Sequence, residues 1–178
     1  MKTEIRLATL DDDEEISKLS VIVWQQTYRD IFSEEFLANL KWQPRVKSRK
    51  KFFEDTTKTS FVAILDQKIV GFCDLGAARL EDAITSLDPS FGEIYAIYVL
   101  QKYEGQGIGT ALYMAAIEQL QKLKFKSLII WTLAANKPAI AFYLKRGCNM
   151  TSWHKSFKAE SQEYTEIALS CNLAEVSK

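Results

Sequence analysis

The sequence lacks the residues that mark a disulfide-stabilised, metal-bound or membrane-inserted protein. Its 178 residues include only three cysteines, three prolines and one histidine. The cysteines are far apart and form no C-x-x-C pair, which argues against a disulfide framework and against a zinc site. The N-terminus runs into the acidic residues 11–15 where a signal peptide has its apolar core. No apolar stretch approaches the roughly 20 residues that span a bilayer. We therefore expect a cytoplasmic protein with no metal and no membrane partner.

Neither positive nor negative charge predominates in the sequence. Lys and Arg number 23, Asp and Glu number 23, and the formal net charge is zero. A broad cationic field, which non-specific nucleic-acid binders use against phosphates, is therefore excluded. Hydrophobic residues make up 47% of the chain, and a chain of this length buries roughly 68 to 70% of its surface on folding. We expect one soluble globular domain over residues 1–178.

Hydrophobic periodicity predicts a mixed α/β fold. Strands are expected at residues 3–8, 61–65, 69–75, 93–99, 127–133, 149–157 and 164–173. Helices are expected after Thr9 and over 28–40, 44–55, 108–123 and 136–146, and a loop is expected over 79–91. Thr9 and Asp12 have the spacing of a capping box, and residues 66–68 have the composition of a hairpin turn.

Two charged runs stand out, and the second admits two interpretations. The acids 11–15 are expected to form the solvated first turn of a helix, where the helix dipole favours them. Five of the seven residues 45–51 are basic, which suggests either a patch for phosphates or acidic partners, or a solvated helix face. The second interpretation is the ordinary one, because Val46, Phe52 and Phe53 have plausible core spacing.

Glycine is scarce, yet three of the seven glycines lie within five residues, between a predicted buried strand and a predicted helix. Exposed N–H groups and the helix dipole make such a junction a binding site for anions. The loop offers the Thr110 hydroxyl and six successive N–H groups, those of Gly105, Gln106, Gly107, Ile108, Gly109 and Thr110. The triphosphatase loop is excluded because no lysine precedes Thr110, and the dinucleotide fingerprint matches poorly because Thr110 replaces its third glycine. The alternative is a tight turn without a ligand.

These residues resemble the GNAT superfamily of N-acetyltransferases. The likeness lies in Ile97-Tyr98-Val99, in the loop from Glu104 to Thr110, and in the segment Asn136 to Tyr143 with Gly147. Glu104 departs from the family pattern, which has Arg or Gln there. The resemblance implies a single-domain mixed sheet of about six to seven strands, splayed at a cofactor slot, with helices on both faces.

The resemblance further implies acetyl-coenzyme A as the cofactor and transfer of its acetyl group to a primary amine. The loop 105–110 would hold the diphosphate, and the backbone of Ile97, Tyr98 and Val99 would pair with the pantetheine arm beside a bulge near residue 96 or 97. Asn136 would touch the same arm. Tyr143 would act as the general acid, unless it merely packs beside Phe142. Glu93, unless it is an exposed edge carboxylate, would act as the base, with a water chain as the alternative.

The acceptor is less well defined by the sequence. Trp24 and Tyr28, with Phe32 and the loop acids Glu81, Asp82 and Asp88, would suit a small cationic amine such as a polyamine or a peptide amino terminus. The alternative is that these aromatics are core residues, as aromatics at helical spacing more often are, and that the acidic loop is simply solvated. His154 is expected at the surface and Cys148 as a buried thiol. A non-catalytic acyl-coenzyme A binding module and an unrelated nucleotide binder are the rival functions, and a homodimer is a compatible assembly.

Overall fold

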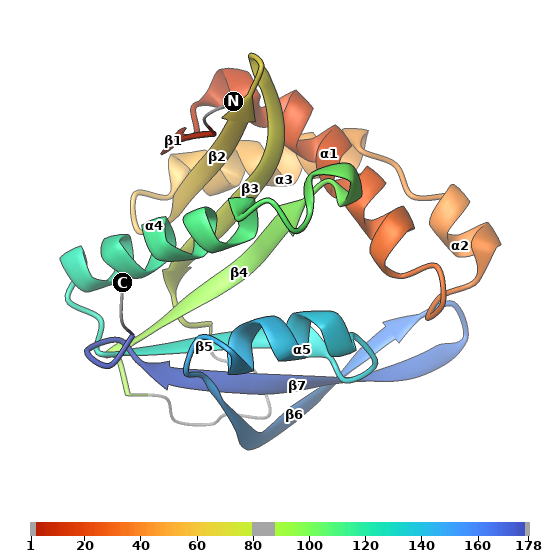
Figure 1. The fold of residues 1–178 in the computed structure, drawn as a ribbon. Coiled ribbons are helices and arrows are strands. Elements are labelled where there is room, and N and C mark those ends of the chain that lie inside the picture. Colours follow the sequence, from red (N-terminus) through yellow and green to blue (C-terminus); the bar gives the residue numbers. More distant parts are fainter. Residues whose placement is uncertain (1–2, 80–87, 177–178) are drawn as a thin grey trace. The chain divides into compact units, whose positions relative to one another are not determined.

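The computed structural model describes residues 3–79 and 88–176, and its chain divides into two compact units. The first unit contains the chain up to residue 75 together with residues 96–116, and the second contains residues 76–95 and the chain from 117 onward. Seven strands form an open mixed sheet in the order β1-β2-β3-β4-β5-β7-β6 (Figure 1). The mixed α/β class is thereby confirmed. The single domain over 1–178 stays a prediction.

The first unit carries most of the N-terminal helices. Its elements are β1 (Glu4–Leu7), the short η1 (Leu10–Asp12), α1 (Asp13–Thr27), α2 (Glu34–Ala38), α3 (Gln43–Glu54), β2 (Thr59–Leu65), most of β3 (Lys68–Ala77), the end of β4 (Phe91–Val99), η2 (Gln101–Tyr103) and the first half of α4 (Ile108–Lys122). The helix predicted over 28–40 is wrong in extent. Only the five residues of α2 are helical there, and the helix is capped by Ser33, whose hydroxyl accepts a hydrogen bond from the Phe36 N–H at 3.1 Å.

Helices cover both faces of the β2–β3 part of this unit. On one face, Ile16 and Leu19 of α1 belong to the same buried cluster as Phe72 of β3. Gly71 comes next to Phe72, so a side chain at 71 would point to the opposite face. A Cβ built there would lie 3.2 Å from Cδ1 of Leu112 in α4. Helix α4 therefore packs on the face opposite α1.

Local turn chemistry follows the prediction closely. Asp66 and Gln67 have positive φ of 49° and 62°, the conformation of the two central residues of a type I′ hairpin turn. Strands β2 and β3 pair antiparallel across this turn. Thr9 and Asp12 form the predicted capping box, in which Oδ2 of Asp12 accepts from the Thr9 N–H at 2.7 Å.

The second unit is built on the C-terminal strands. Residues 91–94 of β4 pair in parallel with residues 127–130 of β5 (Ser127–Leu133). Strand β5 pairs antiparallel with β7 (Gln162–Asn172), and β7 pairs with β6 (Asn149–Ala159) in a long hairpin (Figure 1). Helix α5 (Lys137–Leu144) precedes Gly147, whose φ of 82° suits the left-handed end of a helix.

The acidic run forms the solvated first turn that the sequence suggested only in part, because Asp11, Glu14 and Glu15 are exposed and the other two acids are not. Asp12 and Asp13 are 9% and 5% exposed. Asp12 accepts two hydrogen bonds from the Arg6 guanidinium at 2.7 and 2.8 Å, and these bonds lower the pKa of Asp12 to about 2. Asp13 lies 3.2 Å from Nε of Arg49, and burial raises its pKa. The run therefore turns two of its carboxylates inward to meet arginines.

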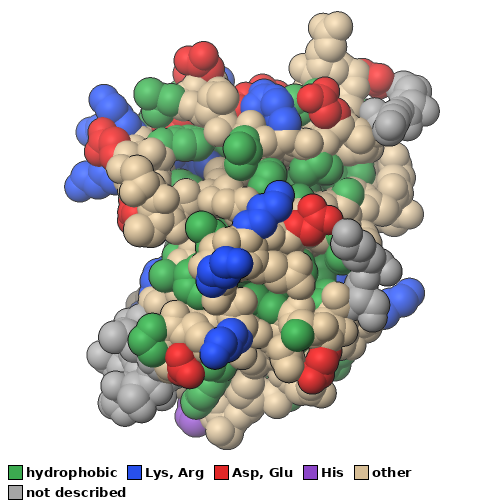
Figure 2. All heavy atoms as spheres, turned by 90° about the vertical axis from the view of Figure 1, so that its left-hand side faces the viewer, with side chains coloured by type: hydrophobic (Ala, Val, Ile, Leu, Met, Phe, Trp, Pro, Cys, Tyr) green, Lys and Arg blue, Asp and Glu red, His purple; other side chains and the backbone are tan. Residues whose placement is uncertain are grey.

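The basic run is likewise split between interior and solvent. Lys47, Lys50 and Lys51 are exposed, whereas Arg45 is half-buried and Arg49 is buried. The guanidinium of Arg49 donates to Oδ2 of Asp74 at 2.6 Å. The interpretation as a solvated face is therefore right for the lysines and wrong for the arginines. On the surface drawn in Figure 2, acidic and basic side chains are interspersed.

Candidate functional site

The glycine loop ends at the start of α4, a helix of 15 residues. Gly105 and Gly107 have φ of 74° and 82°, and a Cβ built on either would meet nothing within 4 Å. The three successive N–H groups of Gly105, Gln106 and Gly107 donate to no acceptor among the described residues. The loop therefore presents a row of open donors next to the positive end of a helix dipole. Glu104 is exposed beside it.

Tyr98 joins the end of β4 to helix α1. Its hydroxyl accepts a hydrogen bond from Nε1 of Trp24 at 3.0 Å, and its ring packs against Phe72 with centroids 5.4 Å apart. Burial raises the pKa of Tyr98, against the opposing effects of the Trp24 hydrogen bond and the Arg45 charge. The side chain of Tyr98 is thus fixed, and with it the backbone of its neighbours Ile97 and Val99.

Trp24 and Tyr28 form one aromatic cluster with Phe32 at the end of α1. The Trp24 and Tyr28 centroids are 4.9 Å apart, and Phe32 stacks on Trp24 at 6.0 Å. Tyr28 and Phe32 are 7% and 3% exposed, so these two rings serve chiefly as core. Trp24 is half-buried, and its hydrogen bond to Tyr98 links the cluster to β4. Of the loop acids expected beside this cluster, Glu81 and Asp82 lie outside the described residues, and Asp88 accepts from the Ser90 N–H in the second unit.

Glu93 is a buried member of an ion pair in the second unit. It is 1% exposed, which excludes the alternative of an exposed edge carboxylate. The Arg79 N–H donates to Oε2 of Glu93 at 2.9 Å, and the Arg79 guanidinium forms a salt bridge with Oε1. That guanidinium also lies over the Tyr95 ring, with Cζ 4.8 Å from the centroid. No pattern in the sequence points to this partner, which is 14 residues away from Glu93 along the chain.

Asn136 caps helix α5 and is 8% exposed. Its Oδ1 accepts from the Ala139 N–H at 3.2 Å, as expected of an N-cap residue. The cap fixes the orientation of the side-chain amide, so Nδ2 points away from the helix. Nδ2 donates to no described residue and is not sealed from solvent. The Nδ2 amino group of Asn136 is therefore available to donate to a ligand.

Tyr143 lies in the last turn of α5 and is 6% exposed. Its ring meets that of Phe142 edge to face, with centroids 5.2 Å apart. The structure thus places Tyr143 on the helix that Asn136 caps, as the sequence predicted. Packing beside Phe142 and a chemical role for the hydroxyl are compatible, because an aromatic edge contact does not involve the phenol oxygen.

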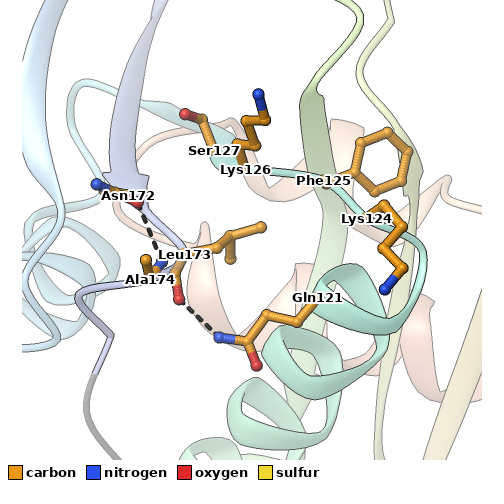
Figure 3. Close-up of a pocket in the computed structure, with 8 residues that line it drawn as sticks. All are labelled: Gln121, Lys124, Phe125, Lys126, Ser127, Asn172, Leu173 and Ala174. Atoms are coloured by element: carbon orange, nitrogen blue, oxygen red, sulfur yellow. Dashed lines mark hydrogen bonds between the residues drawn. The ribbon is translucent and has the colours of Figure 1, made fainter.

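One pocket of about 610 Å³ opens elsewhere in the second unit (Figure 3). Its walls come from the end of α4 with the segment after it and from the end of β7, with Lys124, Phe125 and Leu173 among the lining residues. Gln121 closes one side by donating to the Leu173 carbonyl at 2.6 Å. None of the eight lining residues is a predicted site residue. His154 is exposed and Cys148 is buried, as expected, and the described residues contain no cluster of metal ligands.

Comparison with known proteins decides the family. The model of the Acetyltransferase (GNAT) family matches residues 22–148, which include the glycine loop, Asn136 and Tyr143. The chain belongs to the GNAT family. It is therefore an N-acetyltransferase, and acetyl-coenzyme A is the acetyl donor of this family. Among the described residues, no helix is long and apolar enough to cross a membrane.

Two similar GNAT proteins align with most of the chain. An uncharacterised N-acetyltransferase of Bacillus subtilis, YuaI, is 33% identical over 141 residues, which are 78% of this chain and 76% of that protein. The spermidine N(1)-acetyltransferase of Thermoplasma acidophilum is 22% identical over 154 residues, or 83% and 88% of the two chains.

Solved structures agree in fold. The PaiA N-acetyltransferase of Thermoplasma acidophilum, solved in complex with coenzyme A, has a TM-score of 0.71 at 19% identity, with 97% of this chain and 99% of that chain covered. A ribosomal-protein-alanine N-acetyltransferase of Brucella melitensis has a TM-score of 0.73 at 20% identity, with 95% and 99% covered. At these identities the likeness concerns the fold alone.

Proposed function

We propose that this GNAT protein transfers the acetyl group of acetyl-coenzyme A to a primary amine by direct attack in a ternary complex. The observation that carries the proposal is the loop before α4, where the N–H groups of Gly105, Gln106 and Gly107 have no acceptor among the described residues and both glycines have positive φ. A diphosphate fits these donors, because the space above Gly105 and Gly107 is open and the helix dipole favours negative charge there. Bulk positive charge is not needed.

Residues of β4 and α5 would bind the rest of acetyl-coenzyme A. The backbone of Ile97, Tyr98 and Val99 would pair with the pantetheine arm, since Tyr98 is anchored by Trp24 on its side-chain face. Nδ2 of Asn136 would donate to the same arm while Oδ1 keeps the cap. The bulge expected near residue 96 or 97 remains a prediction.

Two proton transfers complete the chemistry. When bound, acetyl-coenzyme A supplies an acetyl thioester, whose carbonyl carbon forms the new bond to the amine as the carbon–sulfur bond breaks. The Tyr143 phenol would donate a proton to the departing sulfur, which a phenol can do because it stays protonated at neutral pH. The proton lost by the amine would pass to Glu93 or to a water chain. The Arg79 ion pair favours the water chain, because Glu93 would have to give up that partner to accept a proton.

Substitution of Gly107 tests the diphosphate cradle. Gly107→Ala should raise the Kd of acetyl-coenzyme A about tenfold, because a side chain in the left-handed region costs about 1–2 kcal/mol and the loop is expected to relax out of its binding conformation. Isothermal titration measures the change. Gly147→Ala is the matched control, since Gly147 has the same φ of 82° and equally open space. Equal losses of affinity in both variants would show that strain alone, and not the cradle, was responsible.

Two substitutions of Asn136 separate its role as a helix cap from its proposed role in binding acetyl-coenzyme A. Asn136→Asp retains the oxygen that accepts from Ala139, whereas Asn136→Ala removes it and should cost about 1 kcal/mol of stability. Both variants lose the Nδ2 donor, so both should weaken acetyl-coenzyme A binding by about two- to tenfold. Thermal unfolding and titration give the two readouts. Wild-type affinity in Asn136→Asp would contradict the proposed contact with the pantetheine arm.

Release of free thiol from acetyl-coenzyme A tests acetyl transfer itself. A panel of polyamines, amino acids, aminoglycosides and peptides with free amino termini should contain at least one amine that accelerates the release. Tight binding of acetyl-coenzyme A without release for any member would favour the alternative, a non-catalytic acyl-coenzyme A binding module. Absence of binding at millimolar concentration would overturn both.

A further inference from the structure

Arg45 is a cation set into the aromatic cluster of the first unit. Its guanidinium carbon lies 5.3 Å from the centroid of the Trp24 ring, and its Nη1 donates to Oγ of Ser20 at 3.1 Å. The side chain is half-buried, in contrast to the exposed Lys47 and Lys50 of the same helix. Trp24 and Ser20 thus hold the guanidinium in one place.

No carboxylate of the described chain neutralises this guanidinium. Three other arginines of the structure pair with carboxylates: Arg6 with Asp12, Arg49 with Asp13 and Asp74, and Arg79 with Glu93. Among residues 3–79 and 88–176, the guanidinium of Arg45 has as partners only the neutral Ser20 hydroxyl and the face of the Trp24 ring. Removal from water lowers the pKa of Arg45, because a charge that is partly out of water is held at a cost. A fixed, partly desolvated and unneutralised guanidinium is what an anionic ligand requires.

The aromatic cluster connects this cation to β4, the strand that would bind acetyl-coenzyme A. Trp24, which lies under the Arg45 guanidinium, also donates to the Tyr98 hydroxyl at 3.0 Å. Arg45 is close enough to Tyr98 for its charge to act on that phenol. Tyr98 stands between Ile97 and Val99, the residues proposed to pair with the pantetheine arm. An acceptor that approaches the proposed pantetheine arm from the side of Trp24 and Tyr98 would therefore meet Arg45.

We propose that Arg45 binds an anionic group of the acceptor, so that the amine acetylated by this protein also carries a carboxylate or a phosphate. This inference rests on the proposed acetyl transfer. A guanidinium fork binds either group through two parallel hydrogen bonds, and it repels a bare polycation. The acceptor class thus changes from the small cationic amine suggested by the sequence to an anionic amine, such as an amino acid or an amino-sugar phosphate.

Matched pairs of amines test the charge preference. L-Lysine is compared with cadaverine, which lacks the carboxylate, and glucosamine 6-phosphate with glucosamine, while spermidine represents polyamines. Wild-type kcat/KM should be at least tenfold higher for the anionic member of one pair, and the pair that responds identifies carboxylate or phosphate. Arg45→Gln should lower kcat/KM for that member by about ten- to a hundredfold, mainly through KM, and should leave kcat/KM for the member without the anionic group within about twofold. Arg45→Lys should retain part of the preference, and Lys50→Gln on the same helix should retain all of it.

A binding measurement separates this inference from acetyl transfer. The same amines are titrated into wild type and Arg45→Gln, each saturated with coenzyme A, which cannot turn over. Anionic amines that bind wild type more tightly than Arg45→Gln would support the inference even if no thiol is released, and acetyl transfer alone would then fail. Acetylation of spermidine or cadaverine at least as efficient as that of the anionic amines, with Arg45→Gln unchanged, would overturn the inference while acetyl transfer stands. Absence of any Arg45-dependent binding would likewise overturn it.

Discussion

Tyr143→Phe is expected to lower kcat for acetyl transfer by about 10²- to 10⁴-fold, the usual contribution of a positioned general acid. The variant keeps the aromatic ring and its edge-to-face contact with Phe142, so helix α5 should fold as before. Loss of a single buried hydroxyl costs only about 1 kcal/mol of stability. Acetyl-coenzyme A should bind with nearly unchanged affinity, because the proposed diphosphate and pantetheine contacts lie on other residues. Single-turnover thiol release, with titration of acetyl-coenzyme A in parallel, measures both quantities.

A second tyrosine provides the control for Tyr143. Tyr164→Phe removes a phenol from β7 whose hydroxyl lies 3.3 Å from Glu160. It should leave kcat within about twofold. The wild-type rate should also fall at high pH, where the phenol loses its proton, and Tyr143→Phe should lack that limb of the profile. An unchanged kcat in Tyr143→Phe would leave only the packing role beside Phe142.

Local patterns in the sequence predicted the elements that depend on local chemistry. The turn at Asp66 and Gln67, the cap at Asn136 and the left-handed residue at Gly147 each form where the residue type demands it. The two strands 127–133 and 149–157 begin where their apolar periodicity begins. The glycine loop could be found for the same reason, because glycines at positive φ and a following helix are both encoded within a few residues.

Interactions between distant residues could not be predicted in this way. Glu93 is held by Arg79 across a stretch without periodicity, so only the folded chain shows the ion pair. The basic run 45–51 contains a second such case. Arg45 and Arg49 lie four residues apart and so share one helix face, while the three lysines between and after them point to solvent. Arginine differs from lysine in being suited to buried pairs, and this difference was the available signal.

Arg49→Met is expected to lower the free energy of unfolding by about 3–5 kcal/mol, which is the cost of leaving a buried ion pair with one partner. The guanidinium of Arg49 serves two carboxylates, those of Asp13 and Asp74, at 3.2 and 2.6 Å. All three side chains are buried, at 7 to 11% exposure. For a chain of this length the loss corresponds to a fall in Tm of roughly 6–20 °C. Lys47→Met on the exposed face of the same helix should change Tm by at most a few degrees.

The pH dependence of this loss distinguishes an unpaired charge from lost packing. Burial already raises the pKa of Asp13 in the presence of Arg49. Without the guanidinium, protonation of the buried carboxyls relieves the unpaired charge, so the difference between wild type and Arg49→Met should shrink as the pH falls from 7 toward 4. Arg49→Met combined with Asp74→Asn should recover part of the loss at pH 7 for the same reason. A difference in stability that stays constant with pH would mean that Arg49 acts through its packing against Phe53 and Phe72, whose rings lie 5.3 Å from its guanidinium carbon, and not through charge.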